Sequence, residues 1–276
     1  MTQERIALTG EKETLLVTLA AKAGESRLPD TLLRDRWAAS AADRIGCDFR
    51  RLAVDRDLMV GIALRAHILD KWTREFLALH PRATVLHLGC GLDSRVFRVA
   101  PGPEVRWFDL DYPEVIGIRR RLYPDREGTE LVGAAVTDPA WLARIPAEGP
   151  VLIIAEGLLP YLPASEVVPL LDRLVAHFPA GELAFDAYSR IGLWLVAAHP
   201  AIRRTGAELH WALEDPAELE RAIPRLRLSE ELQAYDPAGY GMAQIARMSP
   251  LARGAAFACR MVPGLGRVGR LLRYTF

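Results

Sequence analysis

The feature that most constrains this fold is a short buried strand followed by a glycine turn and the start of a helix. Residues 84–88 are largely apolar or β-branched and end at Gly89, as expected for a strand inside a core. Gly89 and Gly91 allow the backbone to turn tightly and to approach a ligand closely. Asp93 and Ser94 are expected to cap the helix that follows. A ligand at this turn would therefore meet a helix N-terminus and free backbone donors.

A second apolar strand, over residues 105–111, ends in two carboxylates, Asp109 and Asp111. An acid about 20 residues after a glycine turn is where a βαβ nucleotide site binds the ribose hydroxyls. Ser94 stands where the dinucleotide fingerprint has its third glycine. This departure disfavours NAD and favours a ligand of mononucleoside size, such as S-adenosylmethionine. The glycine turn taken alone could equally be an ordinary tight turn.

Strands and helices alternate from about residue 82 onward. Strands are expected near 84–88, 105–109, 130–134, 151–155 and 182–187, with helices near 94–99, 113–121, 138–144 and 164–178 between them. This alternation predicts an α/β fold with a mostly parallel, doubly wound sheet. Ligands of such sheets bind beyond the carboxyl ends of the strands, near the switch in strand order. Gly89, Asp111 and Glu156 should therefore lie at one edge of the sheet.

The chain before this core has the pattern of helices. They are expected over 11–23, 31–42 and 57–79, and a proline at position 81 ends the last of them. We interpret residues 1–80 as a helical N-terminal cap on a core formed by residues 81–276.

The pattern loosens after residue 188. A short helix is expected near 216–222, and a longer one over 242–259 with an interruption at Ser249-Pro250. Residues 226–230 alternate like a strand, and 271–276 could form a final strand beside them. We therefore expect these two segments to lie side by side as strands.

Charge and cysteine content exclude several classes of protein. The chain has 276 residues with 35 basic and 35 acidic side chains, so no general attraction to nucleic acid is expected. Its three cysteines, Cys47, Cys90 and Cys259, show neither a disulfide framework nor metal spacing. We see no signal peptide and no stretch near ~18 uninterrupted apolar residues. We expect a cytoplasmic protein without a membrane span or a metal site.

Three stretches together resemble the leucine carboxyl methyltransferase family. They are LGCGLDSR over 88–95, FDLDYPEVI over 108–116 and AEGLLPYLP over 155–163. Residues 34–38 and 186–190 also resemble one branch of it, the tetracenomycin-type bacterial O-methyltransferases of polyketide biosynthesis. The resemblance spans roughly residues 14–235. It implies a class I methyltransferase fold, Rossmann-like and doubly wound, with S-adenosylmethionine as the methyl donor.

The resemblance also implies which residues bind the cofactor. Gly89 and Gly91 match the glycine turn of the family, and Asp111 matches the acid that accepts hydrogen bonds from the ribose hydroxyls. Glu156 matches a glutamate near the cofactor and the reacting centre. As alternatives, Asp111 could cap the helix that begins at Pro113, and Glu156 could be a solvated carboxylate at a strand end.

Arg65 matches an arginine that binds the methionine carboxylate, and Lys22 resembles a second basic residue in the same role. Arginine suits that role because its guanidinium pairs bidentately with a carboxylate. The family often has an acid where this chain has Ala135 and Val136, which leaves the adenine to backbone and apolar contacts. The alternatives are a solvated arginine at a helix edge and a surface lysine.

The candidate catalytic residues are Glu156, Tyr161 and His210. Tyr161 could line the acceptor pocket or simply pack, and His210 lies in a loose region, residues 189–225, expected to form a lid over the acceptor. The other histidines considered, each interpreted first as structural, are His67, His87 and His199. The run of arginines at 119–121 is interpreted as a solvated helix face.

These observations predict an S-adenosylmethionine-dependent O-methyltransferase. Its acceptor would be a carboxylate or phenol of a small aromatic, polyketide-like molecule, in a pocket shaped by Trp194, Trp211 and Tyr235. A carboxylate is already ionised and needs no base, whereas a phenol must lose its proton. Two alternatives stay open, a methyltransferase-like protein that binds the cofactor without transferring methyl and an NAD-dependent dehydrogenase. A homodimer is possible.

Overall fold

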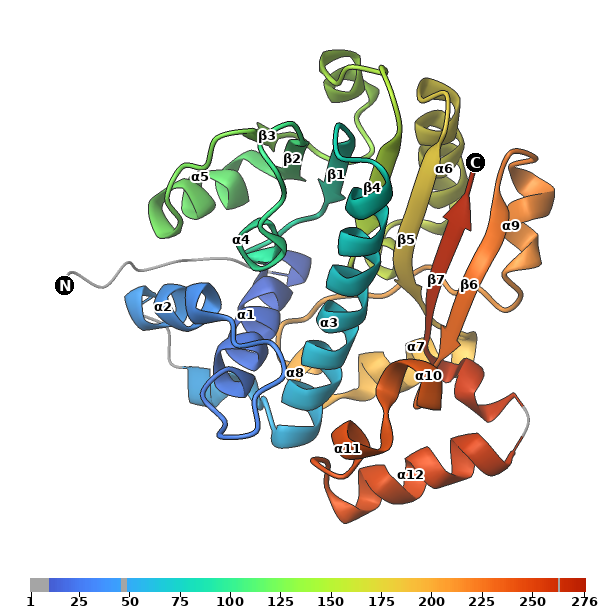
Figure 1. Cartoon of the computed structure of the whole chain (residues 1–276). Helices are drawn as coiled ribbons and strands as arrows, with labels where there is room; N and C mark the ends of the chain where they lie inside the picture. The colour runs from blue at the N-terminus through green and yellow to red at the C-terminus, as the bar shows by residue number, and fades with distance from the viewer. Residues whose placement is uncertain (1–9, 46–48, 263) are drawn as a thin grey trace.

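The computed structural model describes residues 10–45, 49–262 and 264–276, so Cys47 lies outside the described part of the chain. Within it, seven strands form one sheet in the order β3-β2-β1-β4-β5-β7-β6 (Figure 1). The strands are β1 Thr84–Leu88, β2 Arg106–Asp111, β3 Thr129–Gly133, β4 Val151–Ala155, β5 Gly181–Ala187, β6 Arg227–Gln233 and β7 Arg270–Thr275. Strands β1 to β5 run parallel, as predicted. The strand order reverses between β1 and β4, which creates the switch point where ligands bind.

The two C-terminal strands complete the sheet in the opposite sense. β7 pairs antiparallel with β5 on one side and with β6 on the other. The predicted pairing of the last strand with the segment near 226–230 is therefore confirmed, and a register shift interrupts it between Leu228 and Glu230. The central strands β1 and β4 are buried along their whole length, which explains why their sequences are short apolar runs rather than alternating patterns.

Most of the predicted helices are present. The α-helices are α1 Thr14–Glu25, α2 Arg36–Arg44, α3 Arg56–Leu79, α4 Arg95–Val99, α5 Pro113–Leu122, α6 Ala164–His177, α7 Arg190–Ala198, α8 Pro200–Arg203, α9 Ala217–Ala222, α10 Pro237–Tyr240, α11 Met242–Ile245 and α12 Pro250–Met261. Short 3-10 helices are η1 Gly10–Glu13, η2 Phe49–Leu52, η3 Pro139–Arg144, η4 Leu159–Tyr161 and η5 Leu265–Val268. The helix expected near 138–144 is thus a 3-10 helix, η3, and α7, α8 and α10 were not predicted. None of the described helices is long and apolar enough to cross a membrane.

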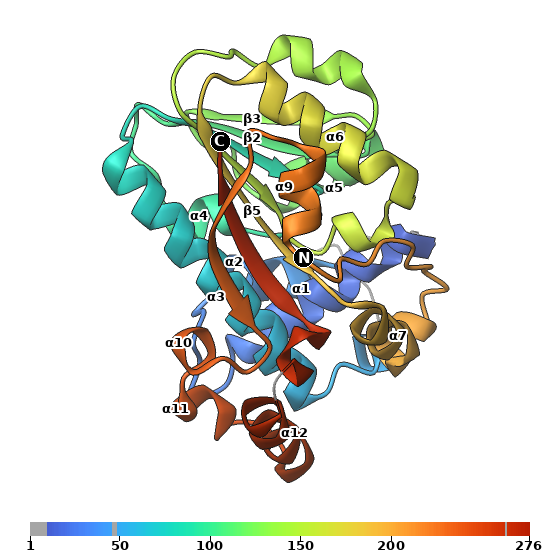
Figure 2. The same cartoon turned by 90° about the vertical axis from the view of Figure 1, so that its right-hand side faces the viewer.

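Helices cover both faces of the sheet. α3 and α4 lie on one face, where Trp72 and Phe76 of α3 pack against strand residues such as Val85 and Leu152 (Figure 2). α6 and α9 lie on the other face, and Leu86 of β1 belongs to that cluster. The alternation of neighbouring strand residues between the two clusters is the period of two expected for a strand buried on both sides.

The N-terminal helices pack in two different parts of the structure. The second half of α3 is part of the layer that covers the sheet. α1 and α2 form a separate cluster with α5, at the end of the sheet where the parallel strands terminate. α1 also contacts α3 directly. The division of the chain at residue 80 into a cap and a core stays a prediction.

One predicted helix start and one predicted capping hydrogen bond are wrong, and side-chain chemistry explains both. The helix expected from residue 31 begins at Arg36, because the Asp35 carboxylate caps it by accepting from the Ala38 amide, while Arg34 has a positive φ of 50°. Ser94 does occupy the N-cap position of α4, but its hydroxyl makes no capping hydrogen bond. It donates to the buried carboxylate of Asp35 instead.

Candidate active site

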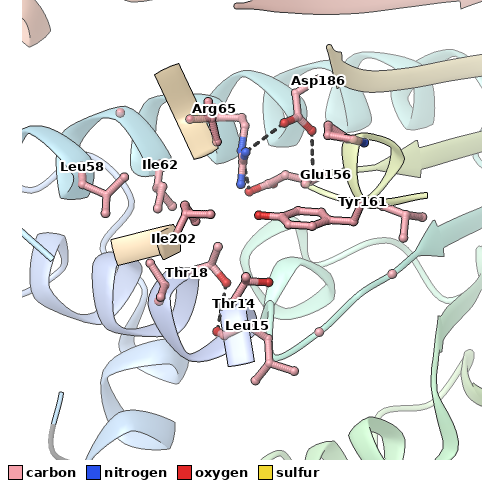
Figure 3. A pocket seen from close by; sticks show the side chains of 18 of the residues that line it. Thr14, Leu15, Thr18, Leu58, Ile62, Arg65, Glu156, Tyr161, Asp186 and Ile202 are labelled. Atoms are coloured by element: carbon pink, nitrogen blue, oxygen red, sulfur yellow. Dashed lines mark hydrogen bonds and ion pairs between the residues drawn. The ribbon is translucent and has the colours of Figure 1, made fainter. Parts of the chain in front are cut away.

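A cavity of about 510 Å³ opens at the carboxyl edge of the parallel strands. Its walls come from α1 and α3 on one side and from the segments after β1, β2, β4 and β5 on the other (Figure 3). Residues of α7, α8 and the segment from residue 234 to 240 complete the lining. The volume is that of a small-molecule site, and the position is where a doubly wound sheet binds its ligands.

The glycine turn after β1 forms the floor of this cavity. Gly89 and Gly91 have φ values of +58° and +49°, and a Cβ added to Gly89 would lie 2.8 Å from a methyl carbon of Leu158. The amide of Gly91 donates to Asp111 Oδ2 over 2.7 Å, so the end of β2 holds the turn. Burial raises the pKa of Asp111, although backbone amides oppose the shift. The predicted proximity of the glycine turn to Asp111 is therefore confirmed.

Glu156, directly after β4, is the centre of a buried ion-pair cluster. Its Oε1 lies 3.1 Å from Lys22 Nζ and 3.3 Å from Arg65 Nε, and its Oε2 accepts from Arg95. Burial alone would raise the pKa of Glu156, but the three cations outweigh it and hold that pKa well below its ordinary value. Glu156 is therefore ionised and holds the side chains of Lys22, Arg65 and Arg95 in place. The alternative of a solvated carboxylate is wrong.

Arg65 reaches this cluster from α3 and points toward Glu156 and Asp186 (Figure 3). Its Nη1 donates to Asp186 Oδ2 over 2.9 Å, and Tyr188 Oη lies 3.3 Å away. Its side chain is only 15% exposed, so the alternative of a solvated arginine is wrong. No partner of Nη2 occurs in the described part of the chain. One edge of the guanidinium therefore stays available to a ligand.

Lys22 enters from α1 and is buried as well, which rules out the alternative of a surface lysine. Its Nζ lies 3.0 Å from Asp93 Oδ2 in addition to Glu156. Asp93 also pairs with Arg98, whose guanidinium reaches Asp70 on α3. The charges therefore form one network that ties α1 and α3 to the glycine turn. The predicted capping role of Asp93 is replaced by these ion pairs.

Four other predicted site residues have different outcomes. Tyr161 lines the cavity with its ring below Glu156 and Arg65 in the view of Figure 3, and burial raises its pKa. Ala135 and Val136 lie beyond β3, outside the cavity lining, and Val136 belongs to the core under α6. His210 has an exposed side chain that is not part of the lining, because its backbone is drawn to the carbonyl of Pro160. The catalytic role of His210 stays a prediction, which this position outside the cavity lining does not support.

A second buried network lies behind the turn and was missed. His87 of β1 lines the cavity, and its Nδ1 lies 3.0 Å from Asp109 Oδ1. Asp109 also pairs with Arg119, which donates to the carbonyls of Gly91 and Asp93. Burial would raise the pKa of Asp109, but these partners lower it to about 2. Arg119 is thus buried, so its assignment to a solvated helix face is wrong.

The residues fit a ligand that joins an amino acid to a nucleoside. Two buried cations, Lys22 and Arg65, stand beside the carboxylates of Asp93 and Glu156, which matches a group carrying both an ammonium and a carboxylate. Asp111, at the other side of the glycine turn, offers an acceptor to a ribose. Apolar side chains form most of the remaining walls. S-adenosylmethionine has this combination of groups.

Comparisons with known proteins agree with this assignment. The family model of leucine carboxyl methyltransferase matches residues 15–175. The tetracenomycin polyketide synthesis O-methyltransferase TcmP of Streptomyces glaucescens is 41% identical over 273 residues, which cover 99% of both chains. The S-adenosyl-L-methionine-dependent methyltransferase dpfgK of Gibberella zeae is 37% identical over 249 residues, covering 83% of this chain and 84% of that one.

Solved structures share the fold at low sequence identity. A protein from Thermobifida fusca is 19% identical with a TM-score of 0.56, and covers 94% of this chain and 93% of its own. A protein of the DUF574 family from Streptomyces avermitilis is 15% identical with a TM-score of 0.58, and covers 93% and 96%. The predicted α/β doubly wound architecture is confirmed by these likenesses and by the strand order.

Proposed function

The chain belongs to the leucine carboxyl methyltransferase family and is an S-adenosylmethionine-dependent methyltransferase, and we propose that it methylates a carboxylate oxygen of a small aromatic, polyketide-like molecule. Membership in this family supports a methyltransferase over the two alternatives, the NAD-dependent dehydrogenase and the binding protein without methyl transfer. The polyketide class rests on the name of the Streptomyces glaucescens relative. The cytoplasmic location and the homodimer stay predictions.

In this proposal the cofactor lies along the carboxyl edge of the sheet. Asp111 accepts from the ribose hydroxyls, while the positive φ of Gly89 and Gly91 keeps side chains away from the ligand. Arg65 and Lys22 bind the methionine carboxylate, and Glu156 holds both cations in place. Bound S-adenosylmethionine supplies an activated methyl group on a sulfonium. The protein's main contribution is then to position the acceptor oxygen and to exclude water.

The observation that carries the choice of a carboxylate is the state of the histidines near the cavity. Nδ1 of His199 accepts from the Ala201 amide over 3.2 Å, so a neutral ring carries its proton on Nε2 and can only donate there. The ring of His87 lies between two carboxylates, those of Asp109 and Asp93. Of the two described histidines that line the cavity, His199 presents only a donor, and Nε2 of His87 lies 3.9 Å from Asp93 Oδ2, beside the glycine turn rather than free toward an acceptor. This arrangement favours an acceptor that is already ionised.

Single-turnover methylation of 1-hydroxy-2-naphthoic acid between about pH 6 and 9 tests this proposal. The probe carries one carboxyl and one phenol, and mass spectrometry distinguishes the ester from the aryl ether. A carboxylate with an ordinary pKa near ~4 is fully ionised throughout this range, so the rate should stay flat and the product should be the methyl ester. An aryl ether formed at a rate that rises with pH would contradict the carboxylate assignment. A failure to methylate either oxygen would count against the aromatic acid.

A further inference from the structure

Tyr240, the last residue of α10, lines the cavity. Among the residues that the structure describes, no hydrogen-bond partner of its hydroxyl is found. Tyr188, which lines the same cavity, differs because its hydroxyl lies 3.3 Å from Arg65 Nη1 and donates to Asp186 Oδ2 over 3.0 Å. A polar group without a partner in a largely apolar cavity is expected to find one in the ligand.

The surroundings of Tyr240 form an aromatic wall. The ring of Tyr235 lies 5.9 Å from that of Tyr240 at an interplanar angle of 49°. Both rings pack against a small apolar cluster formed by Val60, Leu64 and Met248. Tyr235 has a φ of +63°, which is costly for a residue with a large side chain. Such strain persists only where the structure needs the side chain in that direction, which here places a ring in the cavity wall.

We propose that Tyr240 binds the acceptor, donating a hydrogen bond from its hydroxyl to an anionic oxygen of an aromatic acid, while the ring of Tyr235 packs against the aromatic body. This inference rests on the proposed function and adds the residues that select its substrate. The wall formed by Ala234, Tyr235 and Tyr240 and the glycine turn at Gly89 and Gly91 line the same cavity but come from distant parts of the chain. The cofactor and the acceptor would therefore approach from different segments of the chain.

The protonation of Tyr240 agrees with a donor role. Burial raises its pKa to about 12, although the charge of Arg65 opposes the shift. The hydroxyl thus keeps its proton at neutral pH and can donate to an anion. A hydrogen bond to a charged group is stronger than one between neutral groups, so its loss should be measurable in the affinity for the acid.

The test compares wild-type enzyme and Tyr240→Phe by calorimetry, with the cofactor site saturated by S-adenosylhomocysteine so that no turnover occurs. The probes are 2-naphthoate, 1-naphthol and naphthalene. For 2-naphthoate, Tyr240→Phe should raise the dissociation constant about ten- to hundredfold. For naphthalene and for S-adenosylhomocysteine, the constants should stay within about twofold, which also shows that the variant is folded. Tyr235→Leu should weaken binding of the three aromatic probes alike.

Each outcome separates the inference from the proposed function. If Tyr240→Phe binds 2-naphthoate as tightly as the wild type does, the role of Tyr240 is overturned while the aromatic acid stands. If the variant loses affinity for 1-naphthol instead, Tyr240 is supported as the acceptor contact and the carboxylate assignment is overturned. If the wild type binds none of the three probes, the aromatic acceptor is overturned and the inference with it.

Discussion

Replacing Arg65 by alanine should lower the affinity for a ligand that carries the methionine carboxylate and leave the affinity for a ligand without it nearly unchanged. S-adenosylhomocysteine has that carboxylate, whereas methylthioadenosine has the same nucleoside and thioether without it. Truncating one partner of a buried charge pair costs about 2–5 kcal/mol. In Arg65, Nε and Nη1 already serve Glu156 and Asp186, and only Nη2 stays available to the ligand. One contact rather than a bidentate pair places the expected loss near ~2–3 kcal/mol, about 30- to 150-fold in affinity.

The assay is calorimetric titration of Arg65→Ala with both ligands. Affinity for methylthioadenosine should change less than about threefold, because the variant keeps the nucleoside site. The fold should survive because Glu156 retains Lys22 and Arg95, and Asp186 retains the hydrogen bond from Tyr188. Arg65→Lys keeps the charge but not the guanidinium geometry. Its affinity for S-adenosylhomocysteine should therefore lie between that of the wild type and that of Arg65→Ala. Equal weakening of both ligands would refute the carboxylate role and make the effect of Arg65 structural.

Three further predictions concern the turn, the buried charges and the exposed histidine. Gly89→Ala should destabilise the fold by about 1–3 kcal/mol and weaken the binding of S-adenosylhomocysteine, because Gly89 combines a positive φ with a close contact to Leu158. The control is Gly102→Ala, at an exposed position with open space around it, which should change neither the thermal denaturation nor the calorimetric affinity. Lys22→Met should lower the unfolding free energy by about 3–5 kcal/mol at pH 7. The pKa of Glu156 is depressed in the fold, so its ion pairs stabilise the protein above its unfolded pKa of ~4, and this stabilisation is lost on acidification. In urea titrations, the difference in unfolding free energy between the wild type and Lys22→Met should therefore shrink below about pH 4. His210→Ala should keep its single-turnover rate within about twofold, and a larger loss would contradict the placement of this side chain outside the cavity.

The elements that local sequence dictates could be predicted from the sequence. β1 and β4 are short apolar runs between breakers, and their predicted bounds match the structure. The helix over 242–259 was expected to break at a Ser-Pro pair, and α12 indeed begins at Pro250 with Ser249 as its cap. Such features depend on residues within one turn or one strand, so no knowledge of the tertiary structure was needed.

The pairings inside the site could not be predicted in the same way. Arg65 meets Asp186 across 121 positions, and Ser94 meets Asp35 across 59. Nothing local distinguishes a buried arginine with a distant partner from a solvated one, which is why Arg119 was assigned to a helix face. The segment 186–190 did carry a signal, since it belonged to the resemblance, but no role could be given to its acid before the fold was known.

The acceptor end shows the same limit more strongly. Tyr240 lies in a weakly patterned region that the resemblance does not reach, and only the packing of α10 beside the cavity brings it to the site. His210 was predicted as catalytic because it lies in the expected lid, residues 189–225. The first half of that segment does supply cavity residues, but α9, in its second half, packs on the core through Leu219. The lid role of residues 189–225 stays a prediction.

A crystal structure of the enzyme with S-adenosylhomocysteine is the most direct test of the proposed site. The ribose hydroxyls should lie within hydrogen-bond distance of the Asp111 carboxylate, and the ligand carboxylate should lie within about 3 Å of Arg65 Nη2 or Lys22 Nζ. The thioether sulfur should face the end of the cavity that Tyr240 lines. A ligand whose carboxylate contacts neither cation, or whose ribose lies away from the glycine turn, would contradict the assignment of this cavity.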